Sequence, residues 1–328
     1  MNKTPSDPAF SHRANLGLWE LLDMGLAPAL VADTRLGVRP PAQQTPAHLQ
    51  GRQLGQAFGR WLRMRDDPGH APAKARLLAA IAEIVAIDAA AVARSQARLA
   101  FGADWNHGLW ASSACSMAAL MGLVCADLSA QQRLLAELRA IARALAPAAD
   151  SGQLKAADAA CHNLMTQLTR PLGLADEDEA ANRLALVWQS YEAGAALIGQ
   201  GLVALVQDPA KRVPGQVATW LPRLQGQPGV VLNTRRFARV AMRIGEIDLQ
   251  PGDGLLIPLT GDTPDGKALG FGHGPHACPG RQLALDVAVV ALEFALEQVL
   301  AVEPQAWPGE WSWRILPNMR IPVFPEAG

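Results

Sequence analysis

Cysteine is scarce in this chain, and so is any excess of charge of one sign. The 328 residues include four cysteines, at positions 115, 125, 161 and 278, with no paired spacing. A disulfide scaffold needs paired cysteines, so these thiols indicate a reducing compartment, and we expect a cytoplasmic protein. The formal net charge is −1, which argues against nucleic acid as the main partner, because that function requires concentrated positive charge.

Long uninterrupted apolar runs are also lacking. Residues 1–8 contain no apolar signal or anchor. The longest apolar run, Leu109 to Ala126, is interrupted by serines and is short for a membrane-spanning helix. We therefore predict a buried helix there and no membrane partner. Hydrophobic residues make up 50% of the chain, which is enough for one large core.

Helical periodicity dominates the remainder of the chain. Strand-like segments are concentrated late, at residues 229–232, 247–249 and 255–259. These patterns predict a mainly α protein with a small β region. The predicted helices cover residues 73–98, 130–146, 153–169, 179–207 and 281–300.

One thiol lies in a glycine-punctuated loop just before a long apolar helix pattern. The loop reads Phe271-Gly272-His273-Gly274-Pro275-His276-Ala277-Cys278-Pro279-Gly280. Glycines at 272 and 274 permit tight positive-φ turns, which let the backbone lie close to a flat cofactor. The following helix directs its free N–H groups and positive dipole end at the sulfur, which favours a thiolate. This pattern indicates an axial ligand of a redox-active metal, with haem iron the leading case, rather than a structural cysteine in a Gly/Pro turn.

The same loop resembles the haem-binding loop of bacterial-type cytochromes P450. Phe271-Gly272-x-Gly274-x-His276-x-Cys278-x-Gly280 matches every fixed position of that motif. The resemblance implies the cytochrome P450 fold, trimmed at the N-terminus, the lid helices and the loop before the haem-binding segment. It implies that Cys278 is the proximal iron ligand of haem b (iron protoporphyrin IX) and that His276 reaches a propionate. It covers residues 55–328, with 1–54 divergent, and we predict one haem-thiolate domain over 1–328.

Two further segments resemble parts of the family that bind the haem propionates. Trp61-Leu62-x-x-x-Asp66-Asp67-Pro68-x-His70 is similar to the segment that opens the helix crossing the haem edge. The resemblance implies that His70 and Lys74, one helical turn apart, pair with propionates, although Lys74 alone also fits a solvated surface charge. Arg236, in Arg236-Phe237-Ala238, is the implied third partner, with Arg235 or Arg239 in its place if the register slips. A buried carboxylate needs such cationic donors, because an unpaired buried charge is costly.

Residues 186–199 resemble the long helix that crosses the distal haem face. The family has a small residue and Gly, then an acid, then two threonines. Here Glu192 falls on the acid, Ala193 and Gly194 replace both threonines, and Ser190 replaces the helix-loosening glycine. The resemblance implies that Glu192 helps to bring protons from outside. A substrate hydroxyl, an ordered water or Ser190 would have to make the hydrogen bond of the missing alcohol.

Two other departures concern the proximal brace and the lid. The family's Glu-x-x-Arg ion pair falls near Trp220-Leu221-Pro222-Arg223, where Trp220 replaces the acid and Pro222 breaks the helix. Either the brace is rebuilt or the register is shifted. The stretch 129–182 is short for the usual lid helices. This predicts an open or rearranged substrate pocket, completed by another subunit of a homo-oligomer or by a carrier-bound substrate.

These features predict a haem-thiolate oxidoreductase, of monooxygenase type, that oxidises a small organic molecule with dioxygen and two electrons. The electrons would come from a separate ferredoxin- or flavodoxin-type donor, docked near Arg281, Lys267 and Arg76. One open alternative is a haem-thiolate protein with peroxide-driven, isomerase-like or dehydratase-like chemistry, or a non-catalytic haem-binding partner. A distant alternative is a zinc protein that uses His273, His276 and Cys278.

Overall fold

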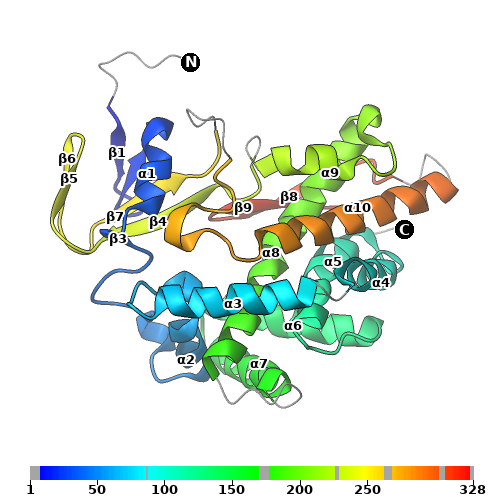
Figure 1. Ribbon diagram of the computed structural model, residues 1–328, viewed down its shortest axis with the longest axis horizontal. Coiled ribbons are helices and arrows are strands. Elements are labelled where there is room, and N and C mark those ends of the chain that lie inside the picture. Colours follow the sequence, from blue (N-terminus) through cyan, green and yellow to red (C-terminus); the bar gives the residue numbers. More distant parts are fainter. Residues whose placement is uncertain are drawn as a thin grey trace.

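The computed structural model describes residues 8–85, 88–169, 177–225, 229–261, 268–302 and 307–325. Helices form most of it, and the strands gather on one side of the helical part (Figure 1). The helices are α1 (Ala27–Ala32), α2 (Gln53–Arg60), α3 (His70–Val85), α4 (Ala89–Phe101), α5 (Trp105–Leu120), α6 (Leu128–Ala144), α7 (Ser151–Thr169), α8 (Glu177–Gln207), α9 (Val217–Trp220) and α10 (Arg281–Val302).

Most of the predicted helices are present, with ends displaced by a few residues. The exception is the predicted helix 73–98, which is wrong as a single element. The helix α4 starts after Asp88, whose carboxylate accepts a hydrogen bond from the Ala91 N–H at 3.0 Å. Such a side chain satisfies the free N–H groups of a helix start, so it separates α4 from α3. The short lid stretch still forms two helices, α6 and α7.

The apolar run that begins at Leu109 lies largely in α5, where nearly every position is buried. This confirms the prediction of a buried helix. None of the helices in the described part of the chain is long and apolar enough to cross a membrane.

The long helix α8 lies at the centre of the helical part. Glycine residues on α8 allow neighbouring helices to pack closely against it. A Cβ atom at Gly194 would lie 1.7 Å from the Ser113 hydroxyl of α5. A Cβ atom at Gly201 would lie 2.4 Å from a methyl group of Leu292 on α10. Because glycine leaves this space open, α5 and α10 pack directly on α8, and α10 carries the predicted cysteine loop at its N-terminus.

The largest sheet combines strands from both ends of the sequence, in the order β1-β2-β7-β4-β3. The pair β2 and β7 is parallel, and the other neighbours are antiparallel. Two hairpins, β5–β6 and β8–β9, complete the β region. The strands are β1 (Phe10–Arg13), β2 (Leu18–Leu21), β3 (Leu36–Gly37), β4 (Asn233–Ala238), β5 (Met242–Ile244), β6 (Ile247–Leu249), β7 (Gly254–Pro258), β8 (Ser312–Leu316) and β9 (Met319–Val323).

The predicted strands at 247–249 and 255–259 correspond to β6 and β7. The predicted strand at 229–232 is wrong, because in this segment only Val231 makes a bridge, isolated from the named strands, to Met319. The regular strand β4 begins at Asn233, where pairing with β7 becomes available.

A stacked pair of tryptophans fixes the segment between α2 and α3 against α8. The Trp61 ring lies on the Trp188 ring with centroids 5.0 Å apart and an interplanar angle of 16°. The Leu62 N–H donates to the Asn182 side chain of α8 at 2.8 Å. These contacts hold the short turn Leu62–Met64 and the start of α3 in place, on the side where the cysteine loop lies.

Candidate haem-binding site

The cysteine loop has the backbone that its glycines predicted. Gly272 has φ +72° and Gly274 has φ +66°, a region that side chains with a Cβ rarely adopt. A Cβ atom at Gly274 would also lie 2.8 Å from the Ala32 side chain of α1. The Cys278 N–H donates to the Phe271 carbonyl at 2.8 Å and closes the loop. Cys278 is thereby held just before Arg281, where α10 begins.

The Cys278 thiol is enclosed by protein and surrounded by cations. Burial raises the pKa of this thiol, while the Gly280 N–H and the positive charges of Arg63, Lys74 and Arg281 act in the opposite direction. Cys278 nevertheless keeps part of its surface accessible. Burial therefore favours the protonated thiol, and a metal ion that bound this sulfur would displace the proton.

Lys74 ties α3 to the cysteine loop. Its ammonium donates to the Pro275 carbonyl at 2.6 Å and to the Ala277 carbonyl at 2.7 Å. Burial lowers the pKa of Lys74, and the nearby Cys278 opposes that change. An ammonium has three donors, so one remains for a propionate. The structure therefore gives Lys74 a role in positioning the loop that the sequence did not indicate, and propionate binding by Lys74 stays a prediction.

His276 pairs with an acid that the sequence did not single out. Its Nε2 lies 2.8 Å from Asp66 Oδ1, and Asp66 also accepts the Val38 N–H at 2.8 Å. Burial alone would raise the pKa of Asp66, but the bonds from His276 and Val38 bring it below its usual value. The His70 ring lies 4.6 Å from the His276 ring. Burial lowers the pKa of His70, and His276 and Lys74 add to this effect.

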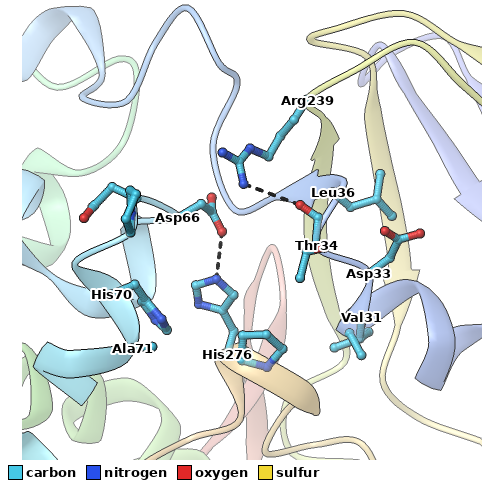
Figure 2. Close-up of a pocket in the computed structure, with 13 residues that line it drawn as sticks. Val31, Asp33, Thr34, Leu36, Asp66, His70, Ala71, Arg239 and His276 are labelled. Atoms are coloured by element: carbon cyan, nitrogen blue, oxygen red, sulfur yellow. Dashed lines mark hydrogen bonds and ion pairs between the residues drawn. The ribbon is translucent and has the colours of Figure 1, made fainter. Parts of the chain in front are cut away.

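A pocket of about 190 Å³ opens onto this histidine pair. Figure 2 shows Asp66, His70 and His276 on one wall and Thr34 with Arg239 on the other. The Arg239 guanidinium donates to the Thr34 carbonyl at 3.4 Å, so it braces the far wall. The pocket gives solvent a route to the edge of the histidine pair.

Arg236 is the arginine of β4 that points inward. It is 4% exposed, whereas Arg235 and Arg239 are exposed. Its Nη1 donates to the Thr234 hydroxyl at 2.9 Å and to the Arg235 carbonyl at 3.0 Å. Burial lowers the pKa of Arg236 to about 10, with Asp66 opposing this change and Arg63 adding to it. The inward direction favours Arg236 over its two neighbours as a ligand of a buried anion.

Buried polar atoms without a partner show that the site fits a haem. Arg236 Nε, a donor, and His276 Nδ1, a ring nitrogen, are buried and lack a partner in the described chain. Leaving such groups without a partner is costly, and two carboxylates beside a flat ring would satisfy them. The thiol of Cys278 and the close backbone at Gly272 supply the remaining features of a haem-thiolate cradle. The residues that the structure brings together therefore match this cofactor.

The predicted distal residues, Ser190, Glu192 and Ala193, lie within about one turn of α8. Burial raises the pKa of Glu192, and Arg314 of β8, 3.9 Å away, opposes this change. Ala193 carries no alcohol. The Ser190 hydroxyl donates to the Val187 carbonyl at 2.7 Å, so it is engaged within the helix. Sequence reasoning missed Ser113 of α5, which donates to the Ser190 carbonyl at 3.1 Å.

Packing takes the place of the Glu-x-x-Arg ion pair. Trp220 is buried in the same apolar cluster that Phe271 packs against, and Arg223 is exposed. Gln225 contacts the other side of the loop, because a Cβ atom at Gly270 would lie 2.6 Å from its side-chain oxygen. The support of the cysteine loop from this segment is therefore mainly apolar.

The described residues give no support to the zinc alternative. They contain no group of three or more His, Cys, Asp or Glu side chains that could hold a metal ion. His273 is exposed, and His276 is turned toward Asp66. Of the cations expected at a donor-docking face, Arg76 and Arg281 are exposed, and Lys267 lies outside the described residues.

Comparison with known proteins identifies the fold. No protein-family model matches the chain. A curated relative, 20-oxo-5-O-mycaminosyltylactone 23-monooxygenase of Streptomyces fradiae, is 27% identical over 165 residues. The match covers 43% of this chain and only 38% of that relative.

Solved structures agree over nearly the whole chain at low identity. Epothilone D-bound cytochrome P450epoK has a TM-score of 0.73 at 16% identity, covering 97% of this chain and 94% of that one. P450BioI, solved with an acyl carrier protein, has a TM-score of 0.72 at 15% identity, covering 93% of this chain and 90% of that one. The Bacillus subtilis cytochrome P450 PksS has a TM-score of 0.70 at 17% identity, covering 94% of this chain and 89% of that one. These similarities confirm the predicted fold class and its resemblance to that family.

Proposed function

Because this chain has the cytochrome P450 fold, we propose that it is a haem-thiolate oxidoreductase that oxidises a small organic molecule in a monooxygenase-type reaction. The observation that supports this most directly is the enclosed thiol of Cys278, held by a positive-φ glycine loop and surrounded by cations. When bound, haem supplies the redox and dioxygen chemistry, and the protein supplies binding, orientation and proton control. We also propose that residues 1–328 form one haem-thiolate domain.

The residues around the loop would hold the cofactor through different contacts. Cys278 Sγ is the iron ligand. Arg236 Nε donates to a propionate, and His276 Nδ1 does so when the ring carries a proton on both nitrogens. His70 and the remaining N–H of Lys74 lie beside them. Asp66 orients His276 by accepting from its Nε2. Lys74 holds the carbonyls of the loop just before the ligand.

Glu192 holds the proton that the reaction needs on the distal side. Its burial favours the protonated carboxyl, and Arg314 limits that effect. A carboxyl whose pKa is raised by burial holds its proton more readily than an exposed carboxyl and can act as a proton donor. The absence of a hydroxyl at Ala193 leaves the substrate or a water to make the hydrogen bond there.

Electrons come from a separate ferredoxin- or flavodoxin-type donor. Arg281 and Arg76, both exposed, supply positive charge for an acidic donor surface near the cysteine loop. Arg281 also lies over the Phe271 ring at 5.7 Å, which keeps this cation close to the ligand.

The decisive experiment is the Soret band of the ferrous–carbonyl complex of the purified protein. The long-wavelength band of thiolate-ligated iron is expected for the wild type and for Cys161→Ala, whose sulfur is in α7. Cys278→Ser should lose the band. Colourless protein from cells supplied with iron and porphyrin precursor would contradict the proposal, and so would an unchanged spectrum of Cys278→Ser.

A haem-thiolate enzyme with other chemistry is the second candidate, and the distal helix favours it. Ala193 has no hydroxyl, and the hydroxyl of Ser190 is bonded within the helix. Turnover with a ferredoxin or flavodoxin donor and dioxygen would support the monooxygenase. Turnover with peroxide alone, or an isomerisation without any donor, would support the second candidate.

A further inference from the structure

A second pocket lies between the first turn of α5 and one face of α6. It has a volume of about 240 Å³ and is lined by His107, Gln132, Leu135, Ala136 and Arg139. The four residues of α6 follow the i, i+3, i+4, i+7 spacing of a single helix face. None of the five residues lines the pocket beside the cysteine loop, so this is a separate site.

A chain of buried hydrogen bonds fixes the His107 ring at this pocket. The Gln96 amide donates to the Cys125 carbonyl at 2.9 Å, and the Gln131 amide donates to the Gln96 side-chain oxygen at 2.8 Å. A backbone carbonyl only accepts, so the direction of both bonds is set. The Gln131 oxygen lies 3.1 Å from His107 Nε2, and it must therefore accept a proton from that nitrogen.

Because Nε2 is bonded inward, Nδ1 is the ring nitrogen of His107 that remains for a ligand. It has no partner in the described chain, and it is not among the buried atoms that lack one. This nitrogen is therefore accessible. When Nε2 carries the ring proton, Nδ1 is a hydrogen-bond acceptor. The interior of the protein thus sets which atom the ring offers to the pocket.

The arginine of the pocket is also without a partner. The Arg139 guanidinium is exposed and makes no hydrogen bond or ion pair with any described residue. Arg133, outside the pocket, donates to the Ser129 hydroxyl at 2.5 Å. Glu137 is the one acid of α6, and it accepts from Asn163 of α7. No carboxylate lines the pocket, so its positive charge is not neutralised there.

These two side chains require a ligand with two different features. A guanidinium such as that of Arg139 binds two oxygens of an anion in parallel. The Nδ1 atom of His107 accepts, so the ligand must also carry a proton. A phosphate monoester has both features, because it loses its second proton at about pH 6 and can share that proton with an imidazole. A carboxylate or a sulfate ester carries no such proton near neutral pH.

We propose that this pocket binds the phosphate monoester of a small organic molecule, with Arg139 on two phosphate oxygens, His107 Nδ1 on the phosphate hydroxyl and Ala136 beside the carbon chain. Ala136 is exposed and offers a small apolar surface, so the organic part is short. This inference goes beyond the proposed function and does not depend on haem.

The test uses matched four-carbon probes and calorimetry on the haem-loaded protein in buffer without phosphate. Butyl phosphate should bind, butyl sulfate should bind about tenfold more weakly, and 1-butanol should not bind. Arg139→Gln should weaken both anions about tenfold or more, because both need the guanidinium. His107→Phe should remove the preference for phosphate over sulfate. Arg133→Gln, outside the pocket, is the control and should leave the affinities unchanged.

Several outcomes would overturn the inference. One is a wild type that does not bind butyl phosphate at about 10 mM. Another is Arg139→Gln with wild-type affinity, and this variant is decisive even if His107→Phe proves unstable, because Arg139 is exposed. Equal affinity of the wild type for the phosphate and the sulfate overturns the assignment to a phosphate monoester. Cys278→Ser should bind butyl phosphate as the wild type does, so failure of the haem-thiolate proposal leaves this test intact.

Discussion

The Nε2 atom of His276 lies 2.8 Å from Oδ1 of Asp66, and this pair joins the cysteine loop to the segment that opens α3. Both side chains are mostly buried, with 10% and 15% of their surfaces exposed. Asp66 also accepts the Val38 N–H. One carboxylate therefore links the cysteine loop, the segment before α3 and the chain next to β3.

Replacing Asp66 with asparagine should lower the free energy of unfolding by about 2 kcal/mol at neutral pH. The reason is that a hydrogen-bonded carboxylate between a histidine and a backbone N–H is lost. The pKa of Asp66 is lowered from 3.8 in the folded protein, so its stabilisation is present above 3.8 and disappears as the pH falls through the folded value. Urea unfolding at about pH 7, 5 and 3 should show the difference between the two proteins narrowing toward acid.

Asp248→Asn is the control for this measurement. Asp248 and its partner Arg243 are exposed and 3.9 Å apart, so this change should have little effect. A constant difference between wild type and Asp66→Asn over the whole pH range would contradict the assigned role of the carboxylate.

Replacing Lys74 with methionine should loosen haem. The variant removes the donor to the Pro275 and Ala277 carbonyls, and both carbonyls lie in the loop just before Cys278. Haem transfer to apomyoglobin is expected to be about tenfold faster or more, because bonds from a charged donor are lost. Lys155→Met, exposed on α7, should keep the wild-type rate. Equal rates for the two variants would show that Lys74 does not support the loop.

Replacing Gly194 with alanine should destabilise the protein although alanine favours helices. The new Cβ would lie 1.7 Å from the Ser113 hydroxyl, and such overpacking costs about 1–3 kcal/mol. Ser113→Gly in the same chain should recover most of that loss, because it removes the atoms in contact. Gly59→Ala is the matched helical control, since its Cβ would meet only the Thr45 hydroxyl at 3.6 Å. Thermal unfolding of the wild type, the three single variants and the double variant measures these differences, and an additive double variant would refute the contact.

The motif at residues 271–280 predicted the fold through its resemblance to the family, together with the segments around Trp61, Glu192 and Arg236. Its glycine loop, thiol and following helix are local features that the sequence shows directly. Arg236 and His276 are predicted site residues because their segments keep the family's spacing, and the structure leaves one buried atom of each without a partner in the described chain.

The missed strands have a non-local cause. The strands β1 and β2 are four residues long. The strand β2 pairs with β7, more than two hundred residues away, and β1 pairs with β2. Sequence periodicity over so few residues does not distinguish a strand from a turn. The partnership of Asp66 with His276 likewise joins two loops that only the folded chain brings together.

Replacing Glu192 with glutamine should slow donor-dependent turnover by about a hundredfold, the usual scale for loss of a positioned proton donor. Burial raises the pKa of Glu192 above 4.5, so the alkaline limb of the wild-type pH–rate profile, where the donor loses its proton, should lie above that value and be absent from the variant. Oxygen consumption at saturating substrate and donor measures both effects. Glu310→Gln, exposed near the C-terminus, should behave as the wild type.

A second variant tests the cause of the raised pKa of Glu192. Arg314 opposes the effect of burial on the pKa of this carboxyl. Arg314→Leu should therefore move the alkaline limb to higher pH while the ferrous–carbonyl spectrum stays unchanged. If Glu192→Gln keeps the wild-type rate, or if Arg314→Leu moves the limb toward acid, then Glu192 is not the proton donor. The distal proton must in that case enter by a route that avoids this face of α8.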